Sequence, residues 1–390
     1  MSSNTPRMVS VIAPCCNERA HVAAFCDEVA RQRLPEGVAL EVLIADGGSD
    51  DGTRELLAAR CAADPRFVLV DNPPRIVSSG LNRCLQRARG EVIVRMDLHT
   101  GYADDYIAEC LAALARSGAA NVGGPWRADG EGALQLGKEN AAAQGEKANG
   151  ATQRENVDGS GVTQCENGNG VRRRENGNGA TQRAIAAAFQ SRWVAGGARS
   201  RDLGYEGPVD TVYLGCWPRE SFERFGNFDE SLVRNQDDEH NLRLVRGGAV
   251  VWQSARIRST YRPRPSLAAL FRQQLQYGYW KPFVMRKHGR AASMRQLVPG
   301  GFVALLGVLT IAAPWLPAAR GALALLVLVY ALYVAAAAFA IAREAGMALL
   351  PRLPSVIAAT HFGYGLGSVR GWLDVLWRGT PSPAFGTLTR

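Results

Sequence analysis

Along the first third of the chain, short apolar runs alternate with longer stretches in which apolar residues recur every three or four positions. Runs of the first kind are typical of buried strands, and stretches of the second kind are typical of amphipathic helices. The strand-like runs are 8–16, 38–46, 66–72 and 91–97, and the helix-like stretches are 18–33, 49–60, 78–88 and 104–116. This alternation predicts an α/β fold, with a mostly parallel sheet covered by helices on both faces.

The last quarter of the chain has a different pattern. Residues 297–317 and 321–342 carry no charged side chain, and each stretch is long enough to cross a bilayer as a helix. A pair of buried core helices is the alternative. The basic stretch 281–295 precedes the first run, whereas only Arg320 lies between the two runs. The positive-inside rule therefore predicts that residues 1–296 lie in the cytoplasm and that the protein is a multi-pass membrane protein.

A third apolar segment, 353–377, is interrupted by charged residues. Gly363, Gly367 and Gly371 recur every four positions, which puts them on one ridge of a helix and permits close helix packing. The segment either spans the membrane or lies flat at its surface. The sequence leaves these alternatives open.

Residues 131–182 interrupt the α/β pattern with Gly, Asn, Gln, Glu and Arg. A short unit recurs there as GATQREN, GVTQCENGNG, GVRRRENGNG and GATQR. These units offer almost no apolar positions for stacking, so we expect a flexible insertion rather than a folded repeat. Regular structure is expected to resume at 184–193.

The net charge of +9 indicates an anionic partner: nucleic acid, a phosphorylated small molecule or an acidic membrane surface. Much of the basic excess lies beside the apolar runs, where anionic lipid explains it, and no nucleic-acid recognition motif is present. The eight cysteines are scattered without a CxxC pair, so we expect reduced thiols and neither a zinc site nor a disulfide framework.

Two acids end strand-like runs. Asp46 closes LIAD, and the following GGSDDGT offers two glycines and, in Ser49 or Asp50, a cap for the next helix. The capped turn leaves Asp46 unexplained, and its carboxylate suits a nucleobase or ribose edge. Asp97 closes a later run, with His99 two residues on, and such a pair can hold a divalent cation that grips a diphosphate.

The stretch NQDDEHNLRL, residues 235–244, places three acids side by side. Acids at the start of a helix are stabilised by the helix dipole, which accounts for part of this cluster. A carboxylate near a bound cation and sugar could instead act as a general base.

Taken in order, CCNE, ADGGSDDGT, RMDLH and NQDDEHNLRL resemble the motifs of the inverting family 2 glycosyltransferases with a GT-A fold. The similarity is strongest to the bacterial exopolysaccharide enzymes of the succinoglycan type, and residues 209–239 resemble their acceptor-side region. The fold class implied is a GT-A catalytic domain, with a Rossmann-like sheet, followed by C-terminal transmembrane helices.

For the donor side, the resemblance implies that Asp46 contacts the nucleotide base and that Asp97 and His99 hold Mg²⁺ or Mn²⁺ on the diphosphate. Glu18 matches the acid after the first strand, and Arg75 stands where a basic residue faces the diphosphate.

For the acceptor side, Asp237 matches the catalytic base, with Gln236 in place of the usual Glu. The run QYGYW resembles the Gln-x-x-Arg-Trp element of chain-extending enzymes, but Tyr279 replaces its Arg, which argues against processive synthesis. The residues expected on the acceptor or diphosphate side are Asp238, Glu239, Gln276 and Trp280.

The resemblance divides the chain into a donor-binding half (1–130), the insertion (131–182), an acceptor and base half (183–296) and a membrane region (297–390). It implies transfer of a hexose, with uridine diphosphate glucose as the expected donor, to a saccharide on a polyprenyl diphosphate at the inner membrane. One alternative is a transferase acting on polyprenyl phosphate itself. Another is a non-catalytic membrane protein that binds nucleotide sugar.

Overall fold

The computed structural model describes residues 6–128, 177–291 and 293–386. Their centre is an eight-stranded sheet in the order β3-β2-β1-β4-β9-β6-β10-β8. The strands are β1 (Met8–Cys15), β2 (Ala39–Asp46), β3 (Phe67–Asp71), β4 (Val92–Arg95), β6 (Asn121–Gly124), β8 (Gly207–Pro208), β9 (Tyr213–Pro218) and β10 (Val251–Gln253). The pairings among β1–β4 and between β6 and β10 are parallel, whereas β9 runs antiparallel to both of its neighbours.

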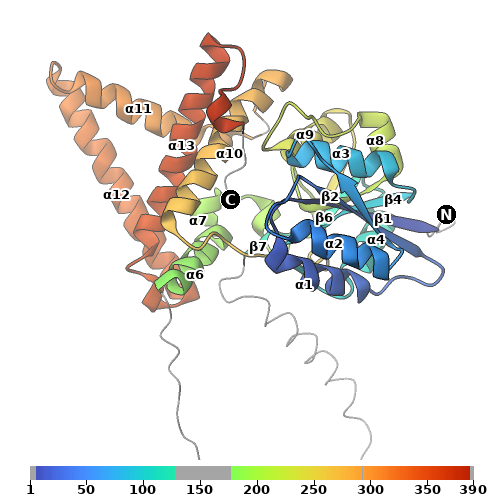
Figure 1. The fold of residues 1–390 in the computed structure, drawn as a ribbon. Coiled ribbons are helices and arrows are strands. Elements are labelled where there is room, and N and C mark those ends of the chain that lie inside the picture. The colour runs from blue at the N-terminus through green and yellow to red at the C-terminus, as the bar shows by residue number, and fades with distance from the viewer. Residues whose placement is uncertain (1–5, 129–176, 292, 387–390) are drawn as a thin grey trace, which may run out of the picture.

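Helices cover both faces of the sheet, as the alternating pattern predicts (Figure 1). On one face, Phe25, Leu57 and Ile107 join the apolar side chains of the strands in one core. On the other face, Leu81 and Leu244 do the same. The helices of the first face are α1 (Arg19–Ala30), α2 (Thr53–Ala63) and α4 (Tyr106–Ser117), and those of the second are α3 (Val77–Arg87), α8 (Arg219–Phe225) and α9 (Gln236–Arg246). The expected α/β fold is therefore present.

A small second sheet, in the order β5-β11-β7, lies beside the main one. It consists of β5 (Thr100–Tyr102), β11 (Ser259–Tyr261) and β7 (Arg127–Ala128). Most of the expected insertion, up to residue 176, lies outside the described residues. The last repeat unit belongs to helix α6 (Gly177–Gln190), so regular structure resumes earlier than the composition suggests. The short helices α7 (Arg192–Ala195) and η1 (Arg199–Arg201) follow it.

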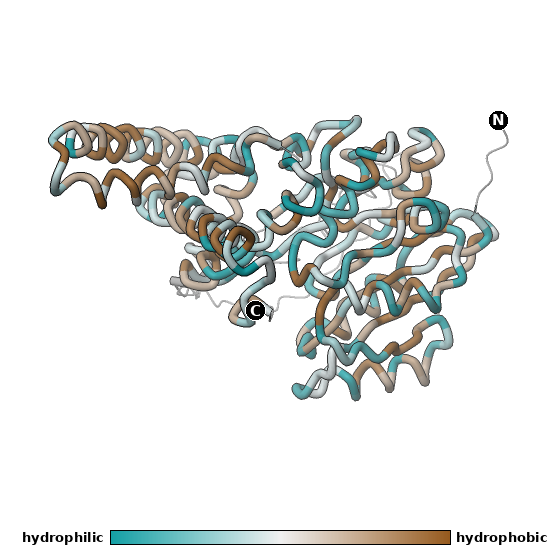
Figure 2. Tube along the Cα trace, turned by 90° about the horizontal axis from the view of Figure 1, so that it is seen from above, coloured by the Kyte–Doolittle hydropathy of each residue, from teal (hydrophilic) through white to brown (hydrophobic). Residues whose placement is uncertain are grey.

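The C-terminal part is helical and extends away from the sheet (Figures 1 and 2). Two of its segments, Met294–Ala312 and Pro317–Ala345, are long and apolar enough to cross a membrane by length and composition. Only 11% and 22% of their most apolar windows are buried, which disfavours the alternative of core helices. The C-terminal elements are α10 (Leu267–His288), η2 (Met294–Gln296), α11 (Val298–Ala312), α12 (Pro317–Ala345), η3 (Met347–Leu349), α13 (Leu353–Trp377) and η4 (Pro383–Phe385).

The glycine ridge of α13 packs closely, and its partner is α10. A Cβ atom at Gly367 would lie 2.1 Å from the Leu275 carbonyl oxygen, and one at Gly371 would lie 2.3 Å from that of Tyr279. Gly278 of α10 completes the contact, since a Cβ there would lie 2.0 Å from a carbonyl oxygen of α13. The two helices therefore meet backbone to backbone.

Candidate active site

The strand-end acids lie at the carboxyl edge of the sheet. Cys15 of β1 pairs with Asp46 of β2, and Ile12 of β1 pairs with Arg95 of β4, two residues before Asp97. Strands β2 and β4 flank β1, so the neighbouring-strand spacing separates them by about 10 Å. Asp46 and Asp97 thus border one stretch of the sheet edge, where open α/β sheets bind ligands.

The carboxylate of Asp46 is fully buried and already has partners. It accepts hydrogen bonds from the Ser49 hydroxyl (2.6 Å) and from Nη1 of Arg54 (3.1 Å). The same guanidinium donates to Asp71, the exposed acid at the end of β3 (2.7 Å). Asp46 therefore has a role in shaping this loop, which the capped-turn interpretation does not foresee.

Neither Ser49 nor Asp50 caps α2, because the N-cap residue is Gly52 and the side chain of the preceding Asp51 binds the first residue of the helix. Oδ1 of Asp51 accepts hydrogen bonds from the backbone N–H (3.0 Å) and the hydroxyl of Thr53 (2.5 Å). Ser49 and Asp50 bind Asn17 instead: the Asn17 N–H donates to the Ser49 hydroxyl (2.7 Å), and its side-chain amide donates to Asp50 (2.8 Å). The loops after β1 and β2 are thereby joined.

Arg75 lies over the glycines that follow β2. Its side chain is exposed, and Nη2 lies 3.0 Å from the position that a Cβ atom would take at Gly48. Gly48 has φ +69°, where a side chain would be strained in any case. The absence of a Cβ therefore lets the guanidinium reach the loop that also holds Asp46.

Asp97 and His99 are each held by a charged neighbour. Arg95 donates to both oxygens of Asp97, from Nε and Nη2 at 2.9 Å each. His99 Nδ1 lies 3.2 Å from Oε1 of Glu18. A carboxylate that accepts the Nδ1 proton leaves Nε2 as the lone-pair donor, which is the usual arrangement around a histidine that binds a metal.

These residues fit a divalent cation as an incomplete ligand set. The Asp97 oxygens retain lone pairs beyond those used by Arg95. No group of three His, Cys, Asp or Glu side chains able to hold a metal ion occurs within the described part of the chain. A cation at Asp97 and His99 would therefore need oxygens from a bound diphosphate, as is common for Mg²⁺.

Asp237 reaches the same place from α9. Its Oδ2 lies 3.9 Å from Nη1 of Arg95, so one buried guanidinium stands between Asp237 and Asp97. Loss of hydration and the charge of Asp238 raise the pKa of Asp237, while Arg95 opposes the rise. A carboxyl with a raised pKa binds a proton more readily, which suits a general base.

The three adjacent acids have separate partners. Burial disfavours the charged form of Asp238, but the ammonium group of Lys281 outweighs this and lowers the pKa of Asp238. Glu239 is fully buried away from Asp237, among cations that also lower its pKa against the effect of burial. The groups that bind Glu239 are Arg243 (2.8 Å), Lys287 (2.9 Å) and His288 (3.0 Å). The mutual repulsion of the three adjacent carboxylates is thus offset, because each of them has its own positively charged partner.

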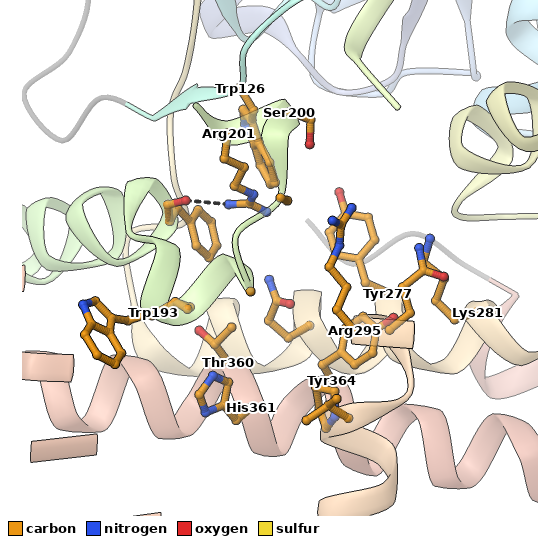
Figure 3. A pocket seen from close by; sticks show the side chains of 18 of the residues that line it. Trp126, Trp193, Ser200, Arg201, Tyr277, Lys281, Arg295, Thr360, His361 and Tyr364 are labelled. Atoms are coloured by element: carbon orange, nitrogen blue, oxygen red, sulfur yellow. Dashed lines mark hydrogen bonds between the residues drawn. The ribbon is translucent and has the colours of Figure 1, made fainter. Parts of the chain in front are cut away.

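Gln276 and Trp280 are buried within the protein. Gln276 accepts a hydrogen bond from Arg234 (3.1 Å), and Trp280 packs in the core formed between α9 and α10. Tyr277 and Lys281, which share another side of α10, line a cavity with Asp237 and Asp238 instead (Figure 3). The sequence analysis missed these two residues and Arg95, although a charge inside the apolar run VIVR requires a buried partner.

The part of the chain that carries the donor-side residues matches a known family. Residues 10–176 match the family described as glycosyl transferase family 2, including some residues beyond the described part. Residues 10–176 therefore match a family 2 glycosyltransferase domain, and the fold that carries them is GT-A.

Among individual proteins, the chain is similar to the succinoglycan biosynthesis protein ExoA of Rhizobium meliloti (strain 1021). The two are 27% identical over 291 residues, which is 74% of this chain and 73% of ExoA. Succinoglycan biosynthesis protein ExoM of the same organism is 28% identical over 30% of this chain and 38% of its own length.

Among solved structures, the mannosyltransferase PcManGT from Pyrobaculum calidifontis, in complex with GDP-Man and Mn²⁺, has a TM-score of 0.53 with this chain. It is 19% identical, and the alignment covers 96% of this chain and 88% of that one. This likeness concerns the fold.

Proposed function

We propose that the protein transfers a hexose from a nucleotide diphosphate sugar to a saccharide carried on a polyprenyl diphosphate, in the assembly of an exopolysaccharide. The observation that carries the proposal is the placement of Arg95 between Asp97 and Asp237. Arg95 contacts both Asp97, the acid expected at the donor diphosphate, and Asp237, the acid expected at the acceptor hydroxyl. The similarity to ExoA supports a role in exopolysaccharide biosynthesis. Glucose is the sugar that the resemblance of the sequence motifs implies.

In this proposal the donor half, 1–130, binds the nucleotide. Asp46 accepts a hydrogen bond from the nucleoside, either beside the Arg54 guanidinium or in its place, since Arg54 keeps Asp71 as a partner. Arg75 faces the diphosphate from above the glycine loop. Glu18 orients His99. A divalent cation, Mg²⁺ or Mn²⁺, would be held by Asp97 and His99 and would neutralise charge on the departing diphosphate.

The acceptor half, 183–296, carries the base. Asp237 accepts the proton of the acceptor hydroxyl, whose oxygen forms a bond to the anomeric carbon from the face opposite the donor diphosphate. The bond between that carbon and the diphosphate oxygen breaks, and the nucleoside diphosphate leaves with the electron pair. A single displacement of this kind inverts the anomeric configuration.

The location follows from the C-terminal helices. Residues 297–390 form the membrane region in this proposal, with α11 and α12 as spans of the inner membrane. The basic end of α10, with Arg286 and Lys287, faces the cytoplasm together with the catalytic domain. An acceptor anchored in the bilayer is then concentrated at the site.

The test is Asp237→Asn in the full chain. We expect donor affinity to stay nearly constant while kcat falls by orders of magnitude, because only transition-state proton transfer is removed. Equal losses of donor affinity and kcat would refute the base assignment. The product separates the acceptor classes, since a glycosyl phosphate would identify polyprenyl phosphate itself as the nucleophile.

A further inference from the structure

A cavity of about 660 Å³ connects the proposed base to the C-terminal helices. At one end it is lined by Asp237 and Asp238. At the other end it is lined by residues of α11 and α12, among them Phe302, Val329 and Tyr330. Its volume is typical of a site for a small molecule, and it leads from the proposed chemistry to the helices suited to a membrane.

The end near Asp238 is rich in cations. Lys281 donates to Asp238, and Arg295 donates to Asp210. Arg201 borders the same space from the side opposite Lys281 and Arg295 (Figure 3). Three cationic groups therefore border this part of the cavity, where phosphate oxygens would find several donors.

Arg201 is the most informative of the three. Its guanidinium donates to the Phe189 carbonyl (2.9 Å) and lies 4.0 Å from the centre of the Trp126 ring. Within the described residues, no carboxylate forms an ion pair with it. Burial accordingly lowers the pKa of Arg201 to about 10. The charge of this side chain is held by a carbonyl and by aromatic faces, which leaves it available to an external anion.

The other end of the cavity is mainly apolar, apart from the Tyr330 hydroxyl and the His361 ring beside it, and reaches the surface. Val329 lies on α12 with 55% of its surface exposed, and Val298 of α11 is 67% exposed. An apolar molecule leaving the cavity between these helices would enter the layer that the helices themselves suit.

We propose that this cavity binds the lipid part of the acceptor: a phosphate ester with its charged head at Arg201, Lys281 and Arg295 and its apolar chain between α11 and α12. This inference rests on the proposed function and assigns the lipid end of the acceptor a site of its own. Because one end of the cavity is cationic and the other is apolar, its best ligand is an amphiphile with a single anionic head group.

Binding probes test the two ends separately. The full chain is placed in detergent micelles, with saturating nucleoside diphosphate to occupy the donor site, and titrated with geranyl diphosphate, inorganic pyrophosphate and geraniol. We expect geranyl diphosphate to bind at least about tenfold more tightly than either of the others, because only it fills both ends. Equal binding of geranyl diphosphate and pyrophosphate would exclude a site for the chain.

Matched variants then locate the binding site of the ligand's apolar chain. Val329 lines the cavity, whereas Val327, two residues before it on α12 and 51% exposed, does not. Val329→Trp is expected to weaken geranyl diphosphate binding about tenfold and to leave pyrophosphate binding unchanged, while Val327→Trp changes neither. Equal effects of the two substitutions would overturn the proposal.

Arg201→Gln tests the head. The substitution is expected to weaken the binding of geranyl diphosphate and of pyrophosphate roughly tenfold, because a hydrogen-bonded charge is lost. The binding of geraniol should not change. Arg295→Gln provides the same test from the opposite side should Arg201→Gln fail to fold. Unchanged binding in both variants would refute the head site. These measurements need no sugar transfer, so a failure of the proposed function would appear in the transfer assay and leave the binding results distinct.

Discussion

Replacing Arg95 tests how the two halves of the site are coupled. The Arg95→Gln substitution removes the positive charge that lies between Asp97 and Asp237 but keeps most of the side-chain volume. A general base works only when it is deprotonated, so the rate falls as the pH drops through the pKa of Asp237. Burial and Asp238 raise this pKa, and Arg95 and Lys281 oppose the rise, so losing Arg95 raises it further.

The magnitude follows from the 3.9 Å separation. The interaction of two unit charges at this distance is about 1 kcal/mol in water and about 4 kcal/mol at an effective dielectric constant of about 20. Because the Asp237 side chain is 36% exposed, screening by water favours the lower figure. A free energy of about 1.4 kcal/mol corresponds to a tenfold change in proton affinity. We therefore expect Arg95→Gln to increase the proton affinity of Asp237 roughly fivefold or more.

The assay is kcat as a function of pH, measured at saturating donor and acceptor for the wild type, Arg95→Gln and Arg95→Lys. We expect the acidic limb of the profile to move to higher pH in Arg95→Gln and to return most of the way in Arg95→Lys, which restores the charge. The substitution also leaves Asp97 without its bidentate partner, so thermal unfolding must show that the variant is folded. A folded Arg95→Gln protein whose acidic limb coincides with that of the wild type would refute the coupling.

Two further predictions concern stability. Glu239→Gln removes the buried carboxylate that Arg243, Lys287 and His288 share and leaves Arg243 without an anion, and should lower the free energy of unfolding by about 3–5 kcal/mol with an unchanged donor KM; an unchanged unfolding midpoint would contradict this account. Gly367→Ala inserts a Cβ atom 2.1 Å from the Leu275 carbonyl oxygen, and should cost about 1–3 kcal/mol, measured by thermal unfolding in detergent. Gly307→Ala, where a Cβ would meet nothing within 4 Å, is the control, and similar losses in both variants would argue against the tight α10–α13 contact.

Local periodicity predicted the first four strands and the helices between them to within a few residues, because each element buries a regular apolar face. It did not reveal β9, which inserts antiparallel between β4 and β6. That pairing joins segments about 120 residues apart in sequence, Val94 with Cys216 for example, and no local pattern records it.

Candidate site residues could be picked out where a polar residue ends a buried strand, as with Asp46 and Asp97, which lie at the carboxyl edge of the sheet. This was harder along α10, which is covered by α13 on one side and by the core around Trp280 on another. A helix buried on several sides has no clear polar face, so its sequence does not indicate that Tyr277 and Lys281, rather than Gln276 and Trp280, line the cavity.

The backbone contact between α10 and α13 has a mechanical consequence. No layer of side chains lies between the two helices, so they cannot shift past each other through rotamer changes. They therefore move as one rigid unit. Tyr277 and Lys281 belong to α10, so their positions are fixed relative to α13. An opening that admits or releases a bulky substrate is then expected in the walls formed by other elements, at the short elements α7 and η1 or between α11 and α12.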